Sequence, residues 1–306
     1  MNDNIERLIQ FISRVIKGKE DVIRYALVTL FARGHLLIED VPGVGKTTLA
    51  FSLAKAIECD FQRIQCTSDL LPSDIIGVNV YNPETREFEF RQGPLFANIV
   101  LVDEINRTSP KTQSALLEAM NERRVSIERR TLSLPEPFMV IATQNPVEYY
   151  GTFPLPESQL DRFMLHLRLG YPDYEYERQA LMEMMDIEEI ESYGYVLRKD
   201  DVIIMQDEVD RVKVDKDILD YILNIVDVTR RHDNIRLGVS TRGAKFLLKA
   251  CRSLAYINGR DYILPDDVKD LAPMVFGHRI ILRSRTYISD ADELIREIVS
   301  GISVPL

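Results

Sequence analysis

The sequence predicts an α/β domain, in which a parallel sheet is flanked by helices, followed by a helical domain. Through the first half of the chain, short apolar runs typical of buried strands alternate with stretches of helical periodicity. That alternation is the pattern of parallel strands joined by crossover helices. After Tyr171 and Pro172 the strand pattern stops and helical periods dominate. We therefore expect an α/β domain over residues 1–172 and a helical domain over residues 173–306.

Individual elements follow from the periodicity of apolar residues. Strands are expected at 35–39, 61–66, 99–102, 138–142 and 164–168, and helices at 4–17, 20–32, 46–58 and 112–121. In the second domain, Ile218, Ile222 and Ile225 recur at helical spacing, and Pro265 with the acidic residues after it predicts a helix start. Two further segments, 74–94 and 124–134, alternate in the manner of hairpins, and we expect both to project from the rim of the sheet.

Composition and charge narrow the class of protein. The chain has 306 residues, of which 45% are hydrophobic and 28% charged, as in ordinary globular proteins. A net charge of −10 argues against sequence-independent binding of nucleic acid by the whole surface. No apolar run approaches the ~18 residues that span a bilayer, and the first residues do not resemble a signal peptide. We expect a cytoplasmic protein whose cysteines, Cys59, Cys66 and Cys251, are reduced thiols.

A phosphate-binding loop is expected at residues 40–48, between a predicted strand and a predicted helix. Its glycines allow a tight turn that brings backbone N–H groups near phosphate oxygens, and the helix N-terminus adds positive character. The strict pattern has glycine at position 40, where this chain has Asp40. We expect this departure to have a small effect, and we expect ATP to be bound by Pro42, Gly43, Val44, Gly45, Lys46, Thr47 and Thr48.

A pair of carboxylates follows the apolar strand at 99–102. Asp103 is placed to hold Mg²⁺ together with the hydroxyl of Thr47, and Glu104 to polarise the attacking water near the γ-phosphate. An Asp-Glu pair after a strand is a weak signal by itself, because acidic residues often end strands. Its position downstream of a phosphate-binding loop makes the catalytic interpretation specific.

Three more polar residues are candidates for the catalytic machinery. Asn145 follows the fourth strand and can orient water, although Asn-Pro is also a common turn. Arg162 is a candidate arginine finger acting on a neighbouring subunit, and the alternative is a pair with a local carboxylate. Arg242 is a second candidate from the helical domain, and the Ser240-Thr241 that precedes it is also a helix N-cap signal.

These motifs, in this order, resemble the AAA+ ATPases, and among them the MoxR family. The resemblance covers nearly the whole chain and is carried by residues 34–47, 92–96, 102–107, 111–120, 142–146, 156–163 and 171–173. MoxR sequences similarly have an acidic residue before Val-Pro-Gly, so the family resemblance accounts for Asp40.

The resemblance implies a five-stranded sheet with a helical lid, and a hexameric ring with ATP and Mg²⁺ between subunits. It implies that Asn145 is the first sensor, Arg162 the finger and Arg242 the second sensor, which in relatives with both hairpins can serve the neighbouring subunit. It also implies that the hairpins point towards the pore. MoxR proteins act as chaperones for protein clients, often beside partners with von Willebrand factor A domains.

The function expected from these features is ATP-driven remodelling of a protein client. One alternative is a DNA-directed AAA+ motor, supported by Arg123, Arg124, Arg129 and Arg130 on the second hairpin and opposed by the acidic total charge. The other alternative is a nucleotide-sensing scaffold that does not hydrolyse ATP, which the complete set of catalytic side chains argues against.

Overall fold

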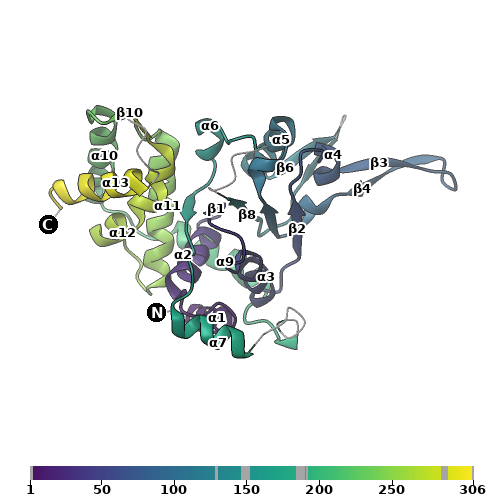
Figure 1. Cartoon of the computed structure of the whole chain (residues 1–306), viewed down its shortest axis with the longest axis horizontal. Helices are drawn as coiled ribbons and strands as arrows, with labels where there is room; N and C mark the ends of the chain where they lie inside the picture. Colours follow the sequence, from purple (N-terminus) through teal and green to yellow (C-terminus); the bar gives the residue numbers. More distant parts are fainter. Residues whose placement is uncertain are drawn as a thin grey trace.

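The computed structural model describes residues 3–127, 130–145, 152–183, 190, 192–283 and 289–304. A central parallel sheet forms the middle of the molecule, and a group of helices from the C-terminal part of the chain lies beside it (Figure 1). The sheet has five strands in the order β2-β5-β8-β1-β9, each parallel to its neighbours. They are β1 (Leu36–Glu39), β2 (Phe61–Gln65), β5 (Ile99–Asp103), β8 (Met139–Gln144) and β9 (Leu165–Leu167). The predicted five-stranded parallel sheet is thus confirmed.

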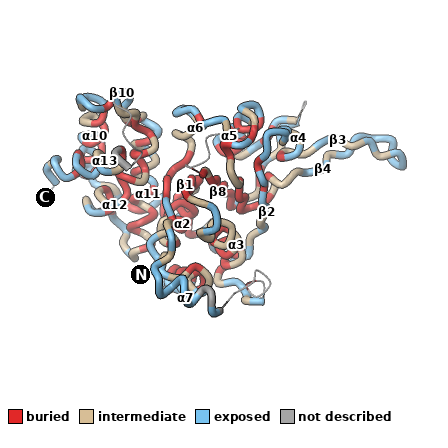
Figure 2. Tube along the Cα trace, in the orientation of Figure 1, coloured by how far each residue is buried: buried red, intermediate tan, exposed pale blue. Residues whose placement is uncertain are grey.

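Both faces of the sheet are covered, which explains why its strands are apolar along their whole length. Leu36 and Ile38 belong to a core shared with the N-terminal helices, whereas Leu37 faces a second core that contains Leu116 and Leu117. Figure 2 shows β1 and β8 as the buried centre between these layers. The helices of this part are α1 (Asp3–Ser13), α2 (Glu20–Phe31), α3 (Lys46–Ala56), α4 (Pro72–Ile76), α5 (Pro110–Glu122) and α6 (Glu157–Leu160), with short turns η1 (Pro94–Phe96) and η2 (Ile105–Arg107).

Two hairpins extend from this body. The first, β3 (Gly77–Asn82) with β4 (Glu87–Gln92), is antiparallel and projects far to the right in Figure 1. The second is β6 (Arg124–Ile127) with β7 (Arg130–Ser133), and residues 128–129 between them lie outside the described residues. Both occur where the alternating sequence patterns predicted hairpins.

The C-terminal part is helical, as expected, with one addition. Its helices are α9 (Lys199–Asp210), α10 (Lys216–Arg231), α11 (Thr241–Ile257), α12 (Pro265–Phe276) and α13 (Ser289–Gly301), with the turn η3 (Gly277–Arg279). The addition is a small antiparallel sheet of β10 (Ile235–Leu237) and β11 (Ile281–Leu282). Strands of two or three residues are too short to produce a period in the sequence, so the pattern did not reveal them.

The first helix after residue 172 does not join this group. The helix α7 (Tyr174–Glu183) lies beside α1 in Figure 1, and the ring of Tyr176 packs directly on Gly18 in the turn between α1 and α2. Further along, Val196 N donates to the carbonyl of Ala56 at 2.8 Å. The chain therefore runs back along the α/β part before it enters the helical group.

Candidate functional site

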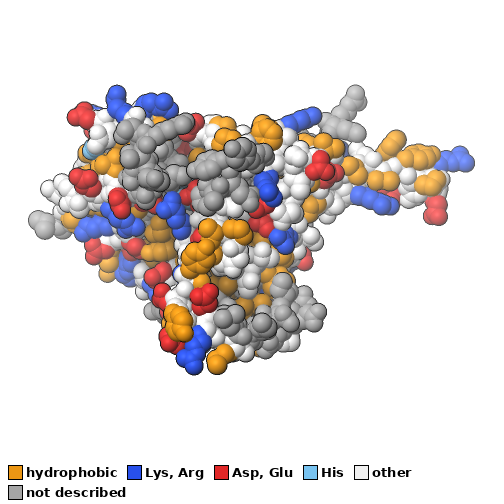
Figure 3. All heavy atoms as spheres, viewed as in Figure 1, with side chains coloured by type: hydrophobic (Ala, Val, Ile, Leu, Met, Phe, Trp, Pro, Cys, Tyr) orange, Lys and Arg blue, Asp and Glu red, His pale blue; other side chains and the backbone are white. Residues whose placement is uncertain are grey.

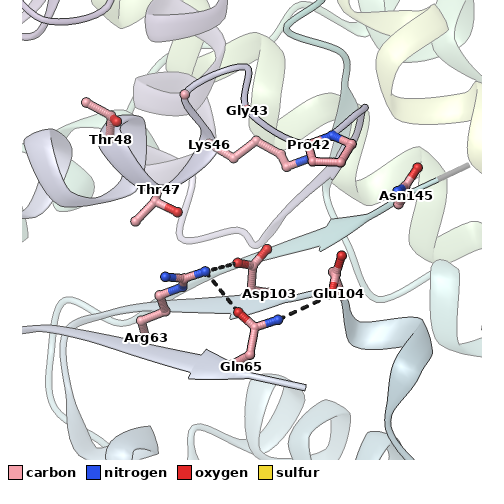
Figure 4. Close-up of a pocket in the computed structure, with 11 residues that line it drawn as sticks. Pro42, Gly43, Lys46, Thr47, Thr48, Arg63, Gln65, Asp103, Glu104 and Asn145 are labelled. Carbon is pink, nitrogen blue, oxygen red and sulfur yellow. Dashed lines mark hydrogen bonds and ion pairs between the residues drawn. The ribbon is translucent and has the colours of Figure 1, made fainter. Parts of the chain in front are cut away.

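The strand order brings three polar strand ends to one edge of the sheet. The loop after β1, the end of β5 and the end of β8 are neighbours there, because β5, β8 and β1 are adjacent parallel strands. Ligands of parallel α/β sheets bind at this carboxyl edge. A pocket of about 420 Å³ lies at this edge (Figure 4). It is lined by Pro42, Gly43, Gly45, Lys46, Thr47, Thr48, Arg63, Gln65, Asp103, Glu104 and Asn145. Of the residues expected at the nucleotide, only Val44, Arg162 and Arg242 are not among those that line it.

The loop before α3 has the backbone of a phosphate-binding loop. Gly43 and Gly45 have φ angles of 87° and 91°, which side chains with a Cβ rarely adopt. Gly45 is also the N-cap of α3, so the first free N–H groups of that helix open towards the pocket. Val44 instead packs against the apolar core, which anchors the loop.

The Lys46 ammonium crosses this loop and donates to the carbonyl oxygens of Asp40 at 2.8 Å and Val41 at 2.9 Å. Burial lowers the pKa of Lys46, while the nearby carboxylates of Asp40, Asp103 and Glu104 act in the opposite direction. The pocket thus has an ammonium group and a helix N-terminus on one side and two carboxylates on the other.

Asp40, the residue that departs from the glycine pattern, is a buried structural link. Its carboxylate accepts from its neighbour Val41 N at 2.9 Å and from Gly170 N at 2.6 Å. Gly170 lies where the chain leaves the sheet towards α7, and its φ of 64° is left-handed. The side chain at position 40 therefore ties the phosphate-binding loop to the segment that leads out of the α/β part, which is a contact that glycine cannot make.

Asp103 ends β5 with both carboxylate oxygens engaged. Thr143 on β8 donates its hydroxyl to Oδ1 at 2.7 Å. Arg63 on β2 donates to Oδ2 at 2.5 Å (Figure 4). Thr47, at the start of α3, lines the same pocket. A hydroxyl and a carboxylate are oxygen donors of the kind that Mg²⁺ prefers, so these two residues fit a magnesium site.

Glu104 has a strained backbone. Its φ of 57° and ψ of 54° are left-handed, a conformation that costs about 1–3 kcal/mol for a residue other than glycine and often marks functional sites. Thr143 stabilises this backbone conformation, because its hydroxyl oxygen accepts a hydrogen bond from Glu104 N at 2.9 Å. The Glu104 carboxylate accepts from Gln65 at 3.2 Å and from Arg107 at 3.0 Å. The side chain is thereby directed into the pocket beside Asp103.

Asn145 lines the pocket from the end of β8 and is 7% exposed. It is the last described residue before a gap, and Pro146 lies outside the described residues. It lines the same pocket as the carboxylates of Asp103 and Glu104.

Arg162 and Arg242 do not line this pocket, and they are connected through Asp161, which directly precedes Arg162 and lies 3.7 Å from Arg242 Nη1. The Asn121 amide, oriented with its oxygen towards the guanidinium, accepts from Arg162 Nε at 3.2 Å and Nη1 at 3.1 Å. Burial lowers the pKa of Arg162, the charge of Arg242 lowers it further, and Glu118 opposes both. Ser240 caps α11 by accepting from Gly243 N at 3.0 Å, so the N-cap interpretation of this segment is confirmed. Arg242 follows in the first turn of that helix.

Three residues of the site were missed in the sequence. Arg63 and Gln65 are exposed on the same face of β2, on either side of the buried Ile64. The register of the sheet pairs Gln65 with Asp103. Thr143 precedes Asn145 by two residues and connects Asp103 to the backbone of Glu104. Only the neighbouring positions of β2, β5 and β8 bring these residues together, and a linear motif does not encode strand order.

Comparisons with known proteins agree with this geometry. Residues 35–165 match the model of the ATPase family associated with various cellular activities, and residues 227–298 match that of the AAA lid domain. The Chaperone MoxR1 of Mycobacterium tuberculosis is 41% identical, over 96% of this chain and 79% of that protein. The chain belongs to the MoxR family of AAA+ ATPases.

Two further relatives extend over nearly the whole of this MoxR-family ATPase. An uncharacterized Bacillus subtilis protein, YeaC, is 50% identical over 98% of the chain and 94% of its own length. The crystal structure of a candidate ATPase from Cytophaga hutchinsonii superposes with a TM-score of 0.90 at 38% identity, covering 99% of this chain and 96% of that one. ATP hydrolysis is a property of the family, and the pocket described above lies in the matched ATPase region.

Other kinds of site find no support in the described part of the MoxR chain. Within the described ranges, no group of three or more His, Cys, Asp or Glu side chains is placed to hold a metal ion. Cys59, Cys66 and Cys251 are free thiols, and burial raises the pKa of Cys59 and of Cys66 to about 12. None of the described helices combines the length and the apolar character needed to cross a bilayer.

Proposed function

We propose that this MoxR protein hydrolyses ATP at sites shared between neighbouring subunits of a ring and uses the reaction to remodel a protein client. In this proposal one subunit supplies the phosphate-binding loop, Asp103, Glu104 and Asn145. Its neighbour supplies Arg162 and Arg242. The observation that carries the proposal is that Arg242 contacts Asp161, the residue directly before Arg162, while neither arginine lines its own subunit's pocket.

The side chains in the pocket have distinct roles in this proposal. Lys46 and the N–H groups of the loop bind the β- and γ-phosphates, which is the established use of such a loop. Thr47 and Asp103 hold Mg²⁺, which supplies positive charge to the phosphates when it is bound. Glu104 accepts a hydrogen bond from the attacking water and orients it, and Asn145 fixes the position of that water.

Charge that develops on the transferring phosphoryl group is stabilised by a guanidinium. Arg63 lines the pocket but is paired with Asp103, so in this proposal the guanidinium comes from the neighbouring subunit. Arg162 is held by the amide of Asn121, so an anion from outside the subunit can compete for it. Arg242 Nη1 lies 3.7 Å from the carboxylate of Asp161, the residue directly before Arg162, so we assign both arginines to the same neighbouring site.

A protein client is favoured by the first hairpin. Tyr81 and Phe88 are 51% and 68% exposed and form an edge-to-face pair with ring centres 5.5 Å apart. Figure 3 shows apolar side chains along this projection, which carries charged groups as well. Between the two hairpins lies a hollow of about 400 Å³ lined by Asn79, Phe88, Phe90, Gln92, Ile127, Arg130 and Leu132. Apolar surface that projects in this way suits contact with polypeptide.

The DNA-directed alternative loses part of its support. Arg123 donates to the carbonyl of Arg33 at 3.0 Å and is half-buried, so it has a structural partner. Arg124 and Arg130 are exposed on the second hairpin, and Arg129 lies outside the described residues. Six subunits in the ring and a partner with a von Willebrand factor A domain remain proposals from the family resemblance.

The test is to measure phosphate release against protein concentration with Mg²⁺ and ATP, for the wild type and for Arg162→Ala. A composite site requires that activity per subunit rises with concentration and that the variant loses about 10³-fold, the lower range for an arginine finger. Lys245→Ala, which removes an exposed cation of α11, is the matched control and should retain the wild-type rate. If activity per subunit does not change with protein concentration and Arg162→Ala is as active as the wild type, the proposed composite site is wrong.

A further inference from the structure

The carboxylate of Asp161 joins the segment that carries Arg162 to the helical lid. Asp161 directly follows α6, and its Oδ1 accepts from Arg279 Nε at 2.9 Å. The hydroxyl of Ser240 donates to both carboxylate oxygens at 3.1 Å. Arg242 Nη1 lies 3.7 Å from Oδ2. One side chain thus contacts three lid residues while its neighbour in the chain is the candidate finger.

Arg279 anchors Asp161 firmly. Its side chain is 1% exposed, and its other donors contact the backbone carbonyl oxygens of Phe163 and Met164, among others, and the ring nitrogen Nε2 of His278. Among the residues that the structure describes, Asp161 is the carboxylate paired with it. A buried guanidinium without its counter-ion is strongly unfavourable, so the Asp161 carboxylate is held in place.

Ser240 transmits this fixed position to α11. Its oxygen accepts from Gly243 N at 3.0 Å as the N-cap while its hydroxyl donates to Asp161. The first turn of α11, from which Arg242 projects, is thereby oriented by Asp161. The Arg242 side chain is 47% exposed, so its guanidinium is accessible to an outside group.

Two neighbouring guanidinium groups repel each other unless an anion compensates them. Arg162 and Arg242 are in this situation, and Asp161 is the carboxylate next to one in the chain and in contact with the other. An additional anion brought by a neighbouring subunit would be attracted by both cations at once.

We propose that Asp161 is a positioning residue, which holds Arg242 beside Arg162 so that both guanidinium groups face one nucleotide phosphate of the neighbouring subunit. Asp161 does not itself touch the nucleotide in this arrangement. It makes the placement of the finger depend on the docking of the lid, through Arg279 and Ser240. This inference rests on the composite site proposed above.

The experiment is a complementation assay between two kinds of subunit. Donor subunits carry Lys46→Ala, so their own site is inactive while their arginines are intact. Acceptor subunits carry Arg162→Ala and Arg242→Ala, so they have an intact pocket and no arginines to offer. Phosphate release is measured for each alone and for equal mixtures with Mg²⁺ and ATP. If the mixture of unmodified donor and acceptor is inactive, the composite site itself is wrong, and the inference falls with it.

Asp161→Asn is then introduced into one partner at a time. In the donor it should lower the rate of the mixture about tenfold or more, since small misplacement of a catalytic group can cost up to about 10²-fold. In the acceptor the loss should be clearly smaller, because that subunit has no arginines to position and only the weakening of the Arg279 ion pair remains. Equal losses in donor and acceptor would mean that Asp161 only stabilises the fold, and this would overturn the inference.

Two further donor variants separate positioning from folding. Ser240→Ala removes the contact between Asp161 and α11 but leaves the Arg279 ion pair, and it should lower the mixture's rate when it is in the donor. Asp267→Asn breaks another buried lid ion pair, with Arg260 at 2.6 Å, and should leave the rate unchanged. Full activity with both the Asp161→Asn and the Ser240→Ala donors would overturn the assignment.

Discussion

Lys46 and Glu104 lie on opposite sides of the pocket proposed to bind the phosphates, and their replacement should have different consequences. Lys46→Ala should abolish nucleotide binding, because it removes the ammonium that neutralises phosphate charge. Glu104→Gln should keep binding and lose about 10²-fold or more in turnover, the range for loss of a group that activates water. Binding of a fluorescent ATP analogue and phosphate release measure the two effects. Glu293→Gln on α13 is the control of equal charge change, and an unchanged rate for Glu104→Gln would exclude its proposed role.

His35 should make stability depend on pH. Its ring is buried, with Nε2 3.0 Å from the carbonyl oxygen of Met120 and Nδ1 accepting from Val140 N at 3.0 Å. Burial lowers the pKa of His35 from 6.5 to about 4. Between these pH values the unfolded chain binds a proton that the folded protein does not, so stability falls as pH falls from 6.5 to 4. The pKa difference corresponds to about 3 kcal/mol.

The measurement for His35 is the free energy of unfolding by urea at several pH values. The amide of His35→Gln retains one hydrogen-bond donor and one acceptor but does not titrate. The free energy of unfolding of this variant should therefore fall less over this pH range than that of the wild type. Comparing the two slopes cancels the contributions of other groups, including the buried His278, whose pKa is also lowered. Identical slopes would show that His35 does not govern this dependence.

At the scale of elements, the first hairpin makes the sharpest prediction. If it contacts client, replacing Tyr81 and Phe88 by serine should lower several-fold the stimulation of phosphate release by a permanently unfolded, carboxymethylated polypeptide. The physical reason is that these two exposed rings present a large apolar surface on the projecting hairpin that a polypeptide can contact. Leu219→Ser with Leu223→Ser on α10 removes exposed apolar side chains elsewhere and should retain stimulation. Unchanged stimulation in the hairpin variant would leave the hairpin without a role in client contact.

The elements also explain which turns the site requires. Glycine at 43 and 45 and the left-handed Glu104 are fixed by the ends of β1 and β5, where the chain must turn sharply away from the sheet. Asp40 adds a constraint of another kind, because its carboxylate connects this turn to Gly170, 130 residues later in the chain. A substitution of Asp40 therefore affects two elements together.

At the scale of the whole molecule, one apolar core runs through both parts of the chain. It includes Ile5 and Leu27 from the N-terminal helices, Leu36 from the sheet, and Leu254 and Ile295 from the lid. Because these residues share one core, the two parts should lose their structure together. We expect far-ultraviolet circular dichroism and tyrosine fluorescence to report the same thermal midpoint, and saturating ADP with Mg²⁺ to raise both equally. Two separated transitions would contradict a shared core.

The sequence by itself determined the five parallel strands, both hairpins, the glycine-containing turn between β1 and α3, and the position of the carboxylates after β5. These features depend on local patterns, such as apolar runs, glycines at a strand–helix junction and polar residues at strand ends. Periodicity and spacing carry such information because neighbouring residues of one element produce it.

Only the tertiary structure decided which distant residues meet. Arg63, Gln65 and Thr143 enter the site through strand order, and Asp161 meets Arg279 and Ser240 because the lid docks against the segment after α6. The short β10–β11 sheet and the return of α7 to the N-terminal helices likewise depend on packing between remote segments. Contacts of this kind depend on how whole elements pack their apolar faces against one another. They therefore cannot be predicted from local sequence patterns.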